Sequence, residues 1–453
     1  PYYRCGLQVE AQRDDMGDRA GADSPPSGWP GQLWLEGRTL VHLLDEQSRP
    51  THMPRGPATK TGEGFLNPAM APSRTRSVLL LADAIEHGWL VDDDKTIRIL
   101  DALCATAVRT RRWRNEVPGQ ERLKITANDL DTNAIDWAKK SHIEPPIGDN
   151  KKGEIEASRF EKESRGEGID GINWVIGDAR SLMEEAPFQW IDLDPFGSPV
   201  DFLDAAIQSL SRVGLLDVTA TDTAALCGSA KTSAARRYGA VGILDSYMHD
   251  DAVRILLGTI ARIAAMHDKV IHPVLSLFDG HHVRVSVILR RSKEAASDFL
   301  ENIGYRIRGE PYYFDAIPTG EYSGPMWTGP LFDAEIAKRM TVERALELCA
   351  VREDDLISDW DERDIEHSKR ELERTVRYIS DCADLLSKEH VLYAVDDLGV
   401  MAGIGQIPAT KAILAEIKSL GYEAERTHTP DTMIATNAPH KDVIEAVKSA
   451  SAK

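Results

Sequence analysis

The chain has 453 residues, which is long enough for two or three domains that each bury a core. Its composition, 42% hydrophobic and 28% charged, is typical of globular proteins, and no apolar run reaches the roughly 18 residues that a membrane span needs. The net charge of -19 argues against a protein that coats nucleic acid in general, because such domains are usually basic. One basic groove on an acidic body remains compatible with this charge.

The five cysteines include no C-x-x-C pair, so zinc-binding and disulfide-linked folds are both poorly supported. The first residues, Pro1 to Arg4, lack the basic and then apolar pattern of a secretory signal. We therefore expect a cytoplasmic protein that has no metal site and does not contact membranes.

The N-terminal part of the chain is rich in glycine, proline and charged residues, and it predicts an extension with little core of its own. A short strand pair is expected at 32–35 and 39–43. Helical periodicity follows from Ser77 to His87, and Gly88 is a suitable residue to end that helix.

Short apolar stretches that end in polar residues predict buried parallel strands in the next part of the chain. Strands alternating with helices, followed by a hairpin, predict a doubly wound, mostly parallel α/β sheet with an antiparallel C-terminal edge hairpin. The expected strands are 96–104, 124–128, 173–176, 190–194 and 214–219, a long helix is expected over 241–267, and the hairpin strands are 270–278 and 282–290.

A polar insertion at about 141–171 interrupts this pattern and predicts a disordered or functional segment. The remaining third of the chain predicts a smaller C-terminal α/β domain, which includes charge-rich, solvated helices over 341–390. We therefore expect an N-terminal extension over 1–62, a catalytic domain over 63–292 and a C-terminal α/β domain over 293–453.

Acidic residues stand near the ends of the first three strands of the predicted sheet. These residues are Asp101, Asp129 and Asp178, and open α/β sheets bind their ligands at this edge. Carboxylates there suit ribose hydroxyls and an adenine amine. The phosphate-binding patterns G-x-G-x-x-G and G-x-x-x-x-G-K-[ST] are both absent. These features favour S-adenosylmethionine, which has no phosphate, over a dinucleotide or ATP.

The fourth strand runs into the turn Asp194-Pro195-Phe196-Gly197, because proline and glycine both end a strand. This turn places a carboxylate, a carbonyl oxygen and an aromatic ring together at the carboxyl end of the strand. An exocyclic amine on a planar base needs two such acceptors and a stacking surface. The turn therefore predicts a pocket for the amine of a base.

Several motifs in a fixed order resemble one family. The segment IDLDPFGSPVDFLDAA, with FLNPAM upstream and LDVTATDTAALCG downstream, is similar to the tRNA guanine-26 N2-dimethyltransferases. The resemblance covers roughly 64–290 and continues in patches through GPMWTGPL and GYEAERTH. It implies a class I methyltransferase fold, S-adenosylmethionine as the donor, tRNA as the partner, and one or two methyl groups added to the 2-amino group of guanine 26.

The resemblance also implies roles for individual residues. Asp194 matches the catalytic aspartate of the family, Pro195 supplies the carbonyl beside it, and Phe196 matches the aromatic ring that stacks on the base. For binding of the methyl donor, the resemblance implies Arg74, Arg109, Asp129, Asp178 and Ala179. We add Asp101 to this group because it stands near the end of a predicted strand.

The chain departs from the family pattern at Ala107, where a glycine is expected. This alanine costs energy if the backbone there has a positive φ, and it is harmless otherwise. The nearby arginines Arg111, Arg112 and Arg114 are expected on a solvated helix face. Two alternatives stay open: another exocyclic-amine methyltransferase, acting on adenine in nucleic acid or on a protein glutamine, and a non-catalytic RNA-binding relative.

Overall fold

The computed structural model describes residues 32–43, 66–91, 95–141, 171–352, 362–388 and 391–452. Most of the expected N-terminal extension, and residues 142–170 of the insertion expected at about 141–171, lie outside the described residues. Among the described helices, none is both long enough and apolar enough to cross a bilayer.

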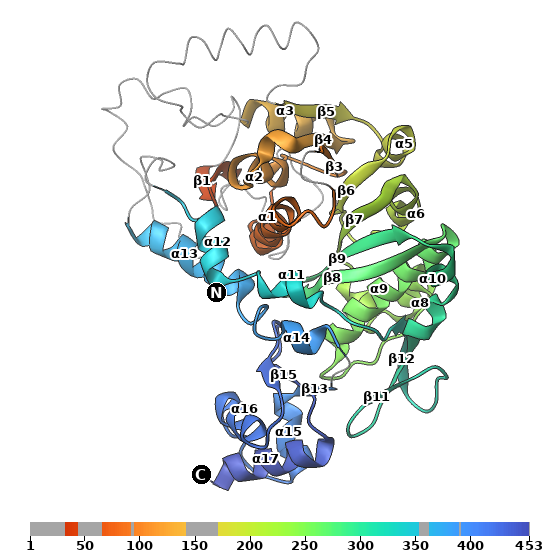
Figure 1. Ribbon diagram of the computed structural model, residues 1–453, viewed down its shortest axis with the longest axis vertical. Coiled ribbons are helices and arrows are strands. Elements are labelled where there is room, and N and C mark those ends of the chain that lie inside the picture. Colours follow the sequence, from red (N-terminus) through yellow and green to blue (C-terminus); the bar gives the residue numbers. More distant parts are fainter. Residues whose placement is uncertain are drawn as a thin grey trace, which may run out of the picture.

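A seven-stranded sheet forms the centre of the molecule, with the strand order β5-β4-β3-β6-β7-β9-β8 (Figure 1). The five strands β3 to β7 are parallel, whereas β9 is antiparallel to both β7 and β8. The predicted doubly wound sheet with an antiparallel edge hairpin is therefore confirmed. The strands are β3 (Ile97–Asp101), β4 (Leu123–Asp129), β5 (Ile172–Ile176), β6 (Phe188–Leu193), β7 (Leu210–Ala220), β8 (Lys269–Asp279) and β9 (His282–Arg291).

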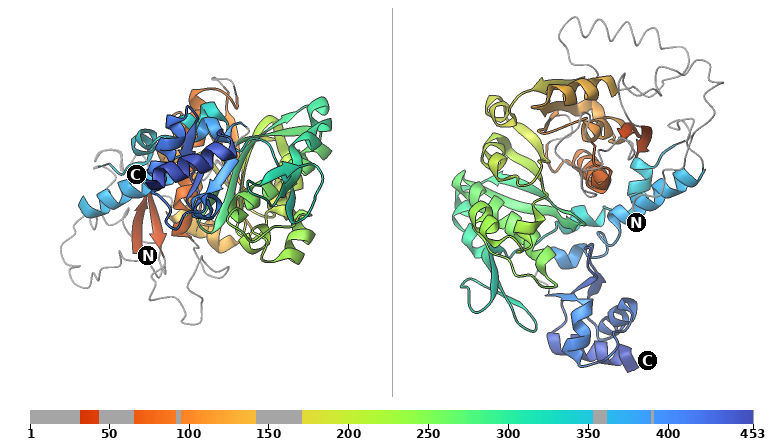
Figure 2. Two further views of the ribbon diagram at one scale, coloured as in Figure 1. Left: turned by 90° about the horizontal axis from the view of Figure 1, so that it is seen from below. Right: turned by 180° about the vertical axis from the view of Figure 1, so that it is seen from behind.

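The central strands are apolar on both faces because helices cover the sheet from both sides. In β6, five of the six side chains are buried. The helices α1 (Ala71–Glu86), α2 (Val108–Glu116) and α3 (Thr132–Ser141) lie on one side of the sheet. On the other side lie α5 (Ala179–Glu185), α6 (Val200–Ser209) and α9 (Met248–Met266), as Figures 1 and 2 show.

Helix α9 begins seven residues later than the sequence predicts, at Met248 instead of Val241. The preceding residues make tertiary contacts that a helix would prevent. Val241 exchanges backbone hydrogen bonds with Gly324, at 2.9 and 2.8 Å. A Cβ atom on Gly242 would lie 2.9 Å from the Cα of Gly228, so two backbones meet here without side chains.

The chain after the sheet returns to cover helix α1. A three-stranded antiparallel sheet comes first, and four described helices follow it. Just after the first of these helices, Arg339 pairs with Asp83 of α1 at 2.6 Å. These elements are β10 (Ile303–Ile307), β11 (Tyr313–Asp315), β12 (Tyr322–Trp327), α11 (Ala334–Lys338), α12 (Val342–Cys349), α13 (Glu362–Val376) and α14 (Ala383–Leu386).

Residues 391–452 form a small α/β unit, the blue lobe at the bottom of Figure 1. Its three strands have the order β13-β15-β14, and its core includes Leu398, Ile413 and Val443. A smaller C-terminal α/β domain is thereby confirmed, whereas the exact division at residues 62 and 292 stays a prediction. The elements are β13 (Val391–Ala394), α15 (Val395–Ala402), α16 (Thr410–Ser419), β14 (Ala424–Arg426), β15 (Met433–Thr436) and α17 (His440–Ala452).

The strand pair near the N-terminus forms as expected, as β1 (Gln32–Glu36) and β2 (Thr39–Leu43). Its turn buries Glu36, which accepts hydrogen bonds from Arg74 at 2.6 Å and from Arg112 at 3.2 Å. Burial alone would raise the pKa of Glu36, but the two guanidinium groups lower it below its ordinary value. The hairpin is therefore fastened to α1 and α2 by a buried carboxylate.

The expectation that the arginines of α2 line a solvated face is wrong for two of them. Arg111 and Arg112 are buried, and only Arg114 is partly exposed. Arg112 donates to Glu116 one turn along the helix at 2.6 Å, so its charge is neutralised inside the protein. Helical charge patterns cannot reveal such burial, because Glu36 comes from a distant part of the chain.

Replacing Glu36 by glutamine is expected to destabilise the fold by about 3 kcal/mol, because it leaves buried guanidinium charge without its carboxylate. Thermal and denaturant unfolding would measure the change. The matched control is Glu366→Gln, which breaks an exposed pair with Arg370 and is expected to leave the midpoint unchanged. Equal midpoints for the two variants would contradict the proposed anchoring role.

Candidate active site

The candidate site lies where the strand order reverses, between β3 and β6. In doubly wound sheets this switch point opens a crevice at the carboxyl ends of the strands. Asp101 ends β3, Asp129 ends β4, and Asp194 follows β6, so their side chains reach the same edge of the sheet. Asp178 follows β5 at the same edge and begins helix α5.

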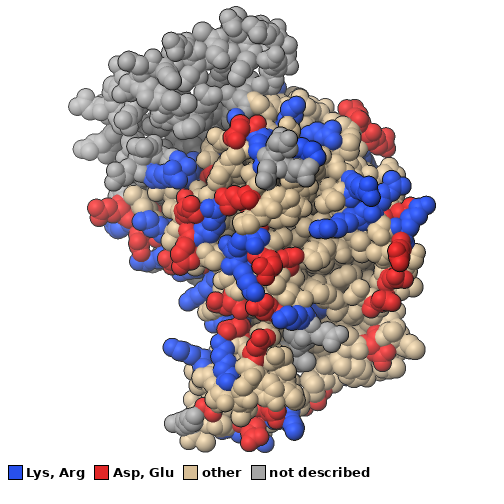
Figure 3. Space-filling view, viewed as in Figure 1, with Lys and Arg blue, Asp and Glu red and all other residues tan. Residues whose placement is uncertain are grey.

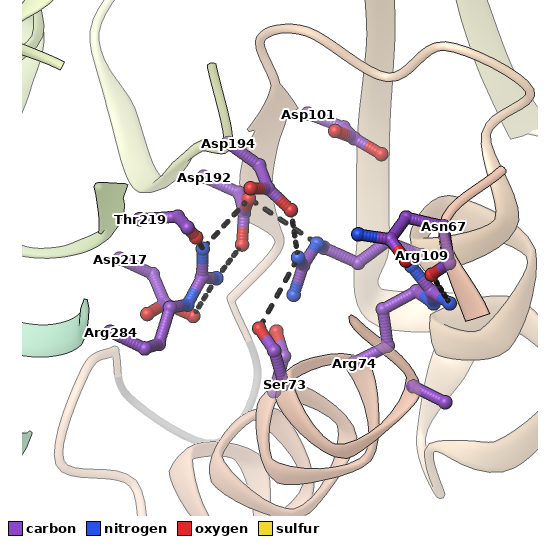
Figure 4. Close-up of polar contacts among 12 residues, drawn as sticks. Asn67, Ser73, Arg74, Asp101, Arg109, Asp192, Asp194, Asp217, Thr219 and Arg284 are labelled. Carbon is purple, nitrogen blue, oxygen red and sulfur yellow. Dashed lines mark hydrogen bonds and ion pairs between the residues drawn. The ribbon is translucent and has the colours of Figure 1, made fainter. Parts of the chain in front are cut away.

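Arg109 connects the carboxylates at the centre of the site (Figure 4). Its Nη2 atom donates to Oδ2 of Asp194 at 2.7 Å, and its Nε lies 3.3 Å from Oδ1 of Asp192. Burial alone would raise the pKa of Asp194, but the positive charges of Arg109 and Arg284 lower it below the ordinary value. Asp194 is therefore a carboxylate at neutral pH, and its side chain keeps 22% exposure.

A second layer of charges lies behind Asp194. Arg284 of β9 pairs with Asp192, pairs with Asp217 of β7 at 2.5 Å, and donates to Thr219 at 2.6 Å. Burial raises the pKa of Asp192 to about 7 although Arg109 and Arg284 oppose that shift. Figure 4 shows this cluster on the side of Asp194 that faces away from Asp101.

Sequence reasoning did not single out Arg284 and Asp217. A signal for them exists, because each is a charged residue flanked on both sides by apolar residues within a strand of the sheet. A buried charge needs an opposite charge, so two such residues on neighbouring strands predict a pair.

The turn that carries Phe196 is fastened to the end of β7. The amide of Gly197 donates to the hydroxyl of Thr221 at 2.7 Å, and the amide of Thr221 donates back to the carbonyl of Gly197 at 2.9 Å. Gly197 has φ of 80°, a conformation that favours glycine. The ring of Phe196 is 46% exposed, and this exposure suits a surface on which a base could stack.

The acidic residues on the donor side are fixed by local hydrogen bonds. Asp129 accepts from the amides of Ala105 at 2.8 Å and Asp131 at 3.0 Å. Asp178 caps helix α5 by accepting from the amide of Arg180, and Ala179 is buried beside it. The exposed side chain of Asp178 also pairs with the side chain of Arg180 at 2.6 Å, so this carboxylate already has a structural role.

Asp101 is buried in the middle of the candidate site and accepts from Thr110 at 2.7 Å. Burial raises the pKa of Asp101 to about 6, and the neighbouring carboxylates Asp194 and Asp129 add to the shift, while Arg109 and Thr110 oppose it. Asp101 therefore gains a proton in a pH range where an ordinary aspartate stays charged.

Arg74 lies beside the site, on the first turn of α1, where Ser73 contacts Arg109 at 3.5 Å. Its guanidinium, however, is turned to Glu36 and to the carbonyl of Asn67, at 2.6 and 3.0 Å. The structure thus brings Arg74 close to the other predicted residues but pairs it with the N-terminal hairpin.

The loop between β3 and α2 has a strained backbone. Ala105 and Ala107 have φ of 46° and 54°, both in the left-handed region that alanine avoids. The amide of Ala107 donates to the carbonyl of Cys104 at 2.6 Å, which closes a tight turn beside Asp129. The alanine that replaces the expected glycine therefore carries the cost anticipated for a positive φ.

The donor set of the site suits S-adenosylmethionine. Carboxylates at the ends of β4 and β5 can accept from ribose hydroxyls and an adenine amine. The Nη1 atom of Arg109 is buried and has no hydrogen-bond partner among the described residues, so an N–H group is available for a carboxylate ligand. Within the described ranges, no group of three or more His, Cys, Asp or Glu side chains is placed to bind a metal ion.

The strand order and the acidic residues at the switch point define a class I methyltransferase that uses S-adenosylmethionine. The family model of the N2,N2-dimethylguanosine tRNA methyltransferases matches residues 44–448. A tRNA (guanine(26)-N(2))-dimethyltransferase of Pyrococcus abyssi is 32% identical, covering 91% of this chain and 99% of its own. The corresponding enzyme of Pyrococcus furiosus is 34% identical over 85% of this chain and 92% of its own.

The solved structure of Trm1 from Pyrococcus horikoshii with S-adenosyl-L-methionine agrees with this assignment. It has a TM-score of 0.68 and 28% identity, and the match covers 92% of this chain and 99% of that one. The chain belongs to the N2,N2-dimethylguanosine tRNA methyltransferase family.

Replacing Ala107 by glycine is expected to stabilise the protein by about 0.5–1 kcal/mol, because glycine adopts the left-handed conformation without steric cost. The midpoint of thermal unfolding would measure the gain. The matched control is Ala350→Gly, at an ordinary φ of -66°, where the same change is expected to lower stability. A loss of stability at both positions would show that the strain at Ala107 is not significant.

Proposed function

We propose that the chain transfers methyl groups from S-adenosylmethionine to the exocyclic 2-amino group of guanine 26 in tRNA, and that it adds two. One observation carries the proposal: at the switch point of a methyltransferase fold, a charged Asp194 lies beside an exposed Phe196 on a rigid turn. The family and its relatives are dimethyltransferases of this guanine.

The methyl donor is assigned to the crevice along β3, β4 and β5. Asp129, Asp178 and Ala179 bind the nucleoside end, and Arg109 binds the carboxylate end through its unpartnered Nη1. Asp101 lies between them, where its negative charge attracts a cation. Arg74 contributes positive charge near the same end and is oriented by Glu36.

The guanine amine is a poor nucleophile because its lone pair is delocalised into the ring. In the proposed site, its N–H groups donate to the carboxylate of Asp194 and the carbonyl of Pro195. These hydrogen bonds favour a pyramidal nitrogen with its lone pair free for attack. S-adenosylmethionine supplies a methyl group on a positively charged sulfur, and the sulfur–carbon bond breaks as the nitrogen–carbon bond forms.

Asp194 then accepts the proton that the nitrogen must lose. Because Arg109 lowers the pKa of Asp194, the carboxylate is a weak base toward a neutral amine. The nitrogen becomes strongly acidic as positive charge develops on it, so a weak base is sufficient at that moment. Arg109 thus keeps Asp194 charged and correctly oriented before the reaction.

Phe196 is assigned to stacking on the target base, which contributes about 1–3 kcal/mol by analogy with single-stranded nucleic acids. Guanine 26 lies within a folded RNA, so the base must leave its stack before it reaches Asp194. For the second methyl group, the monomethylated amine still has one N–H to donate. The C-terminal domain, proposed over 293–453, serves to dock the tRNA.

A cytoplasmic location follows from this proposal, because tRNA and S-adenosylmethionine are substrates found inside the cell.

Nucleoside mass spectrometry after incubation with tRNA and S-adenosylmethionine tests the reaction. We expect N2,N2-dimethylguanosine from a tRNA with guanine 26 and none from a tRNA with another base there. Methyladenosine alone, or methylation of a protein glutamine, would favour the alternative enzyme class. Intact tRNA binding without any methyl transfer would favour a non-catalytic relative.

Replacing Asp194 by asparagine is expected to lower kcat at least about 10²-fold, because the amide cannot take the proton but keeps an oxygen for Arg109. Binding of S-adenosylmethionine should change little. Single-turnover methyl transfer and equilibrium dialysis measure the two quantities. The control, Asp204→Asn, alters a 68% exposed carboxylate of α6 and should leave both unchanged. If the Asp194→Asn variant kept the kcat of the parent enzyme, Asp194 could not be the group that accepts the proton.

The affinity for S-adenosylmethionine is expected to fall as pH falls through about 6. The pKa of Asp101 is raised, so its charge is lost on acidification at a pH where an ordinary aspartate keeps it. Between pH 7 and 5 the dissociation constant should rise by up to about tenfold. Calorimetric titration checks this, and Asp101→Asn should bind more weakly at pH 7 with a flat profile. If the affinity of the Asp101→Asn variant depended on pH as steeply as that of the parent, Asp101 would not be the group that causes the pH dependence.

A further inference from the structure

Three side chains form a cluster at the junction between helix α13 and the C-terminal unit, well separated from Asp194 in sequence. They are Arg377 and Tyr378, just after α13, and Arg426, at the end of β14. The guanidinium carbons of Arg377 and Arg426 lie 5.1 and 4.9 Å from the ring centroid of Tyr378. Both distances are within the range of cation–π contacts, so one ring orients two positive charges. We call these residues the Tyr378 cluster.

The two arginines of the Tyr378 cluster have no carboxylate partner among the described residues. Arg426 donates to Thr432 at 3.4 Å, and its buried Nε has no partner within the same ranges. By contrast, Arg254, Arg306 and Arg339 each pair with an aspartate. The chain has 73 acidic and 54 basic residues, and acidic and basic side chains are interspersed on the face in Figure 3. Two adjacent arginines without carboxylates therefore suit an anion from outside the chain.

The backbone of Tyr378 is held in an unfavourable conformation. Its φ of 68° lies in the left-handed region, which is rare for a bulky aromatic residue. Neighbouring contacts maintain it: the ring of His428 donates from Nδ1 to the carbonyl of Arg377 at 2.9 Å, and the amide of Cys382 donates to the carbonyl of Tyr378 at 3.2 Å. Such strain recurs at binding sites, where surrounding structure fixes a side chain in place.

Polar contacts attach the segment before the cluster to helix α1 and to the end of β8. Arg76 of α1 donates to the carbonyl of Thr375, two residues before Arg377, at 3.1 Å. The same guanidinium pairs with Asp279, which ends β8. Ser73, one helical turn before Arg76, contacts Arg109, and Arg109 pairs with Asp194. The segment just before the Tyr378 cluster therefore contacts helix α1 and the end of β8, two elements at the edge of the sheet that carries the candidate site.

We propose that the Tyr378 cluster binds the sugar-phosphate backbone of the tRNA beside the nucleotide that is methylated. The proposal rests on the function proposed above. Guanidinium groups bind phosphate oxygens in pairs, and the ring of Tyr378 keeps both groups oriented before the RNA arrives. The attachment of the neighbouring segment to α1 and to the end of β8 suits this role, because the flanking backbone must be held while the base is turned out toward Asp194.

The test compares Arg377→Gln, Arg426→Gln and the double variant with the parent enzyme, using full-length tRNA with guanine 26. We expect the KM for tRNA to rise about five- to tenfold for each single variant, with unchanged kcat and unchanged KM for S-adenosylmethionine. The slope of log affinity against log salt concentration should become shallower by about one for each phosphate that is no longer bound. A merely structural role would not alter this slope.

Two further variants sharpen the comparison. Arg370→Gln on α13 removes an exposed arginine that pairs with Glu366, and it should leave the salt slope unchanged. Tyr378→Phe keeps the ring and should behave as the parent, whereas Tyr378→Leu should raise the KM for tRNA without changing kcat. If phosphate bound through the ring hydroxyl alone, Tyr378→Phe would raise the KM for tRNA as much as Tyr378→Leu, and this result would overturn the proposal.

The outcomes separate this inference from the proposed function. If the parent methylates guanine 26 but the double variant keeps the parent KM and salt slope, the cluster does not bind tRNA. A loss of S-adenosylmethionine binding in the arginine variants would assign them a structural role and would also overturn the proposal. If the parent enzyme methylates no tRNA, the proposed function is wrong, and the proposal that the cluster binds tRNA is overturned with it.

Discussion

The active site depends on one buried ionic network, in which two arginines pair with three aspartates. Arg109 connects Asp194 with Asp192, and Arg284 connects Asp192 with Asp217. Removing several carboxylates from water is costly unless each has an opposite charge in good geometry. Arg109 and Arg284 supply positive charge here, so Asp194 stays charged although most of its side chain is buried. The sheet contributes because β6, β7 and β9 place these residues side by side.

The class of fold could be predicted well from the sequence, because its signals are local. Apolar strands alternate with helices, and the turn Asp194-Pro195-Phe196-Gly197 ends β6 as proline and glycine require. Residues at strand ends could also be placed together, since parallel strands share one carboxyl edge. Of the predicted set, Asp101, Asp129, Asp178, Asp194 and Arg109 all reach that edge. Their individual roles remain predictions.

Pairings between distant segments could not be predicted in this way. Nothing near Arg112 in the sequence reveals that Glu36 neutralises it, and the helical spacing of α2 favoured exposure instead. Likewise, the sequence pattern predicts a start of α9 that is too early, because the backbone bonds of Val241 with Gly324 form only in the folded chain. The sign of φ at Ala107 was open for the same reason, since loop conformation depends on what packs around it.

The hairpin of β1 and β2 has a consequence for how the catalytic part of this chain can be isolated. Its sequence predicts an extension with little core of its own, yet it provides a carboxylate that lies more than thirty positions from its partner Arg74. A fragment that starts at residue 63 would keep every predicted catalytic and donor-binding residue. It would nevertheless lack the counter-charge that orients Arg74, so a complete catalytic unit must include β1 and β2.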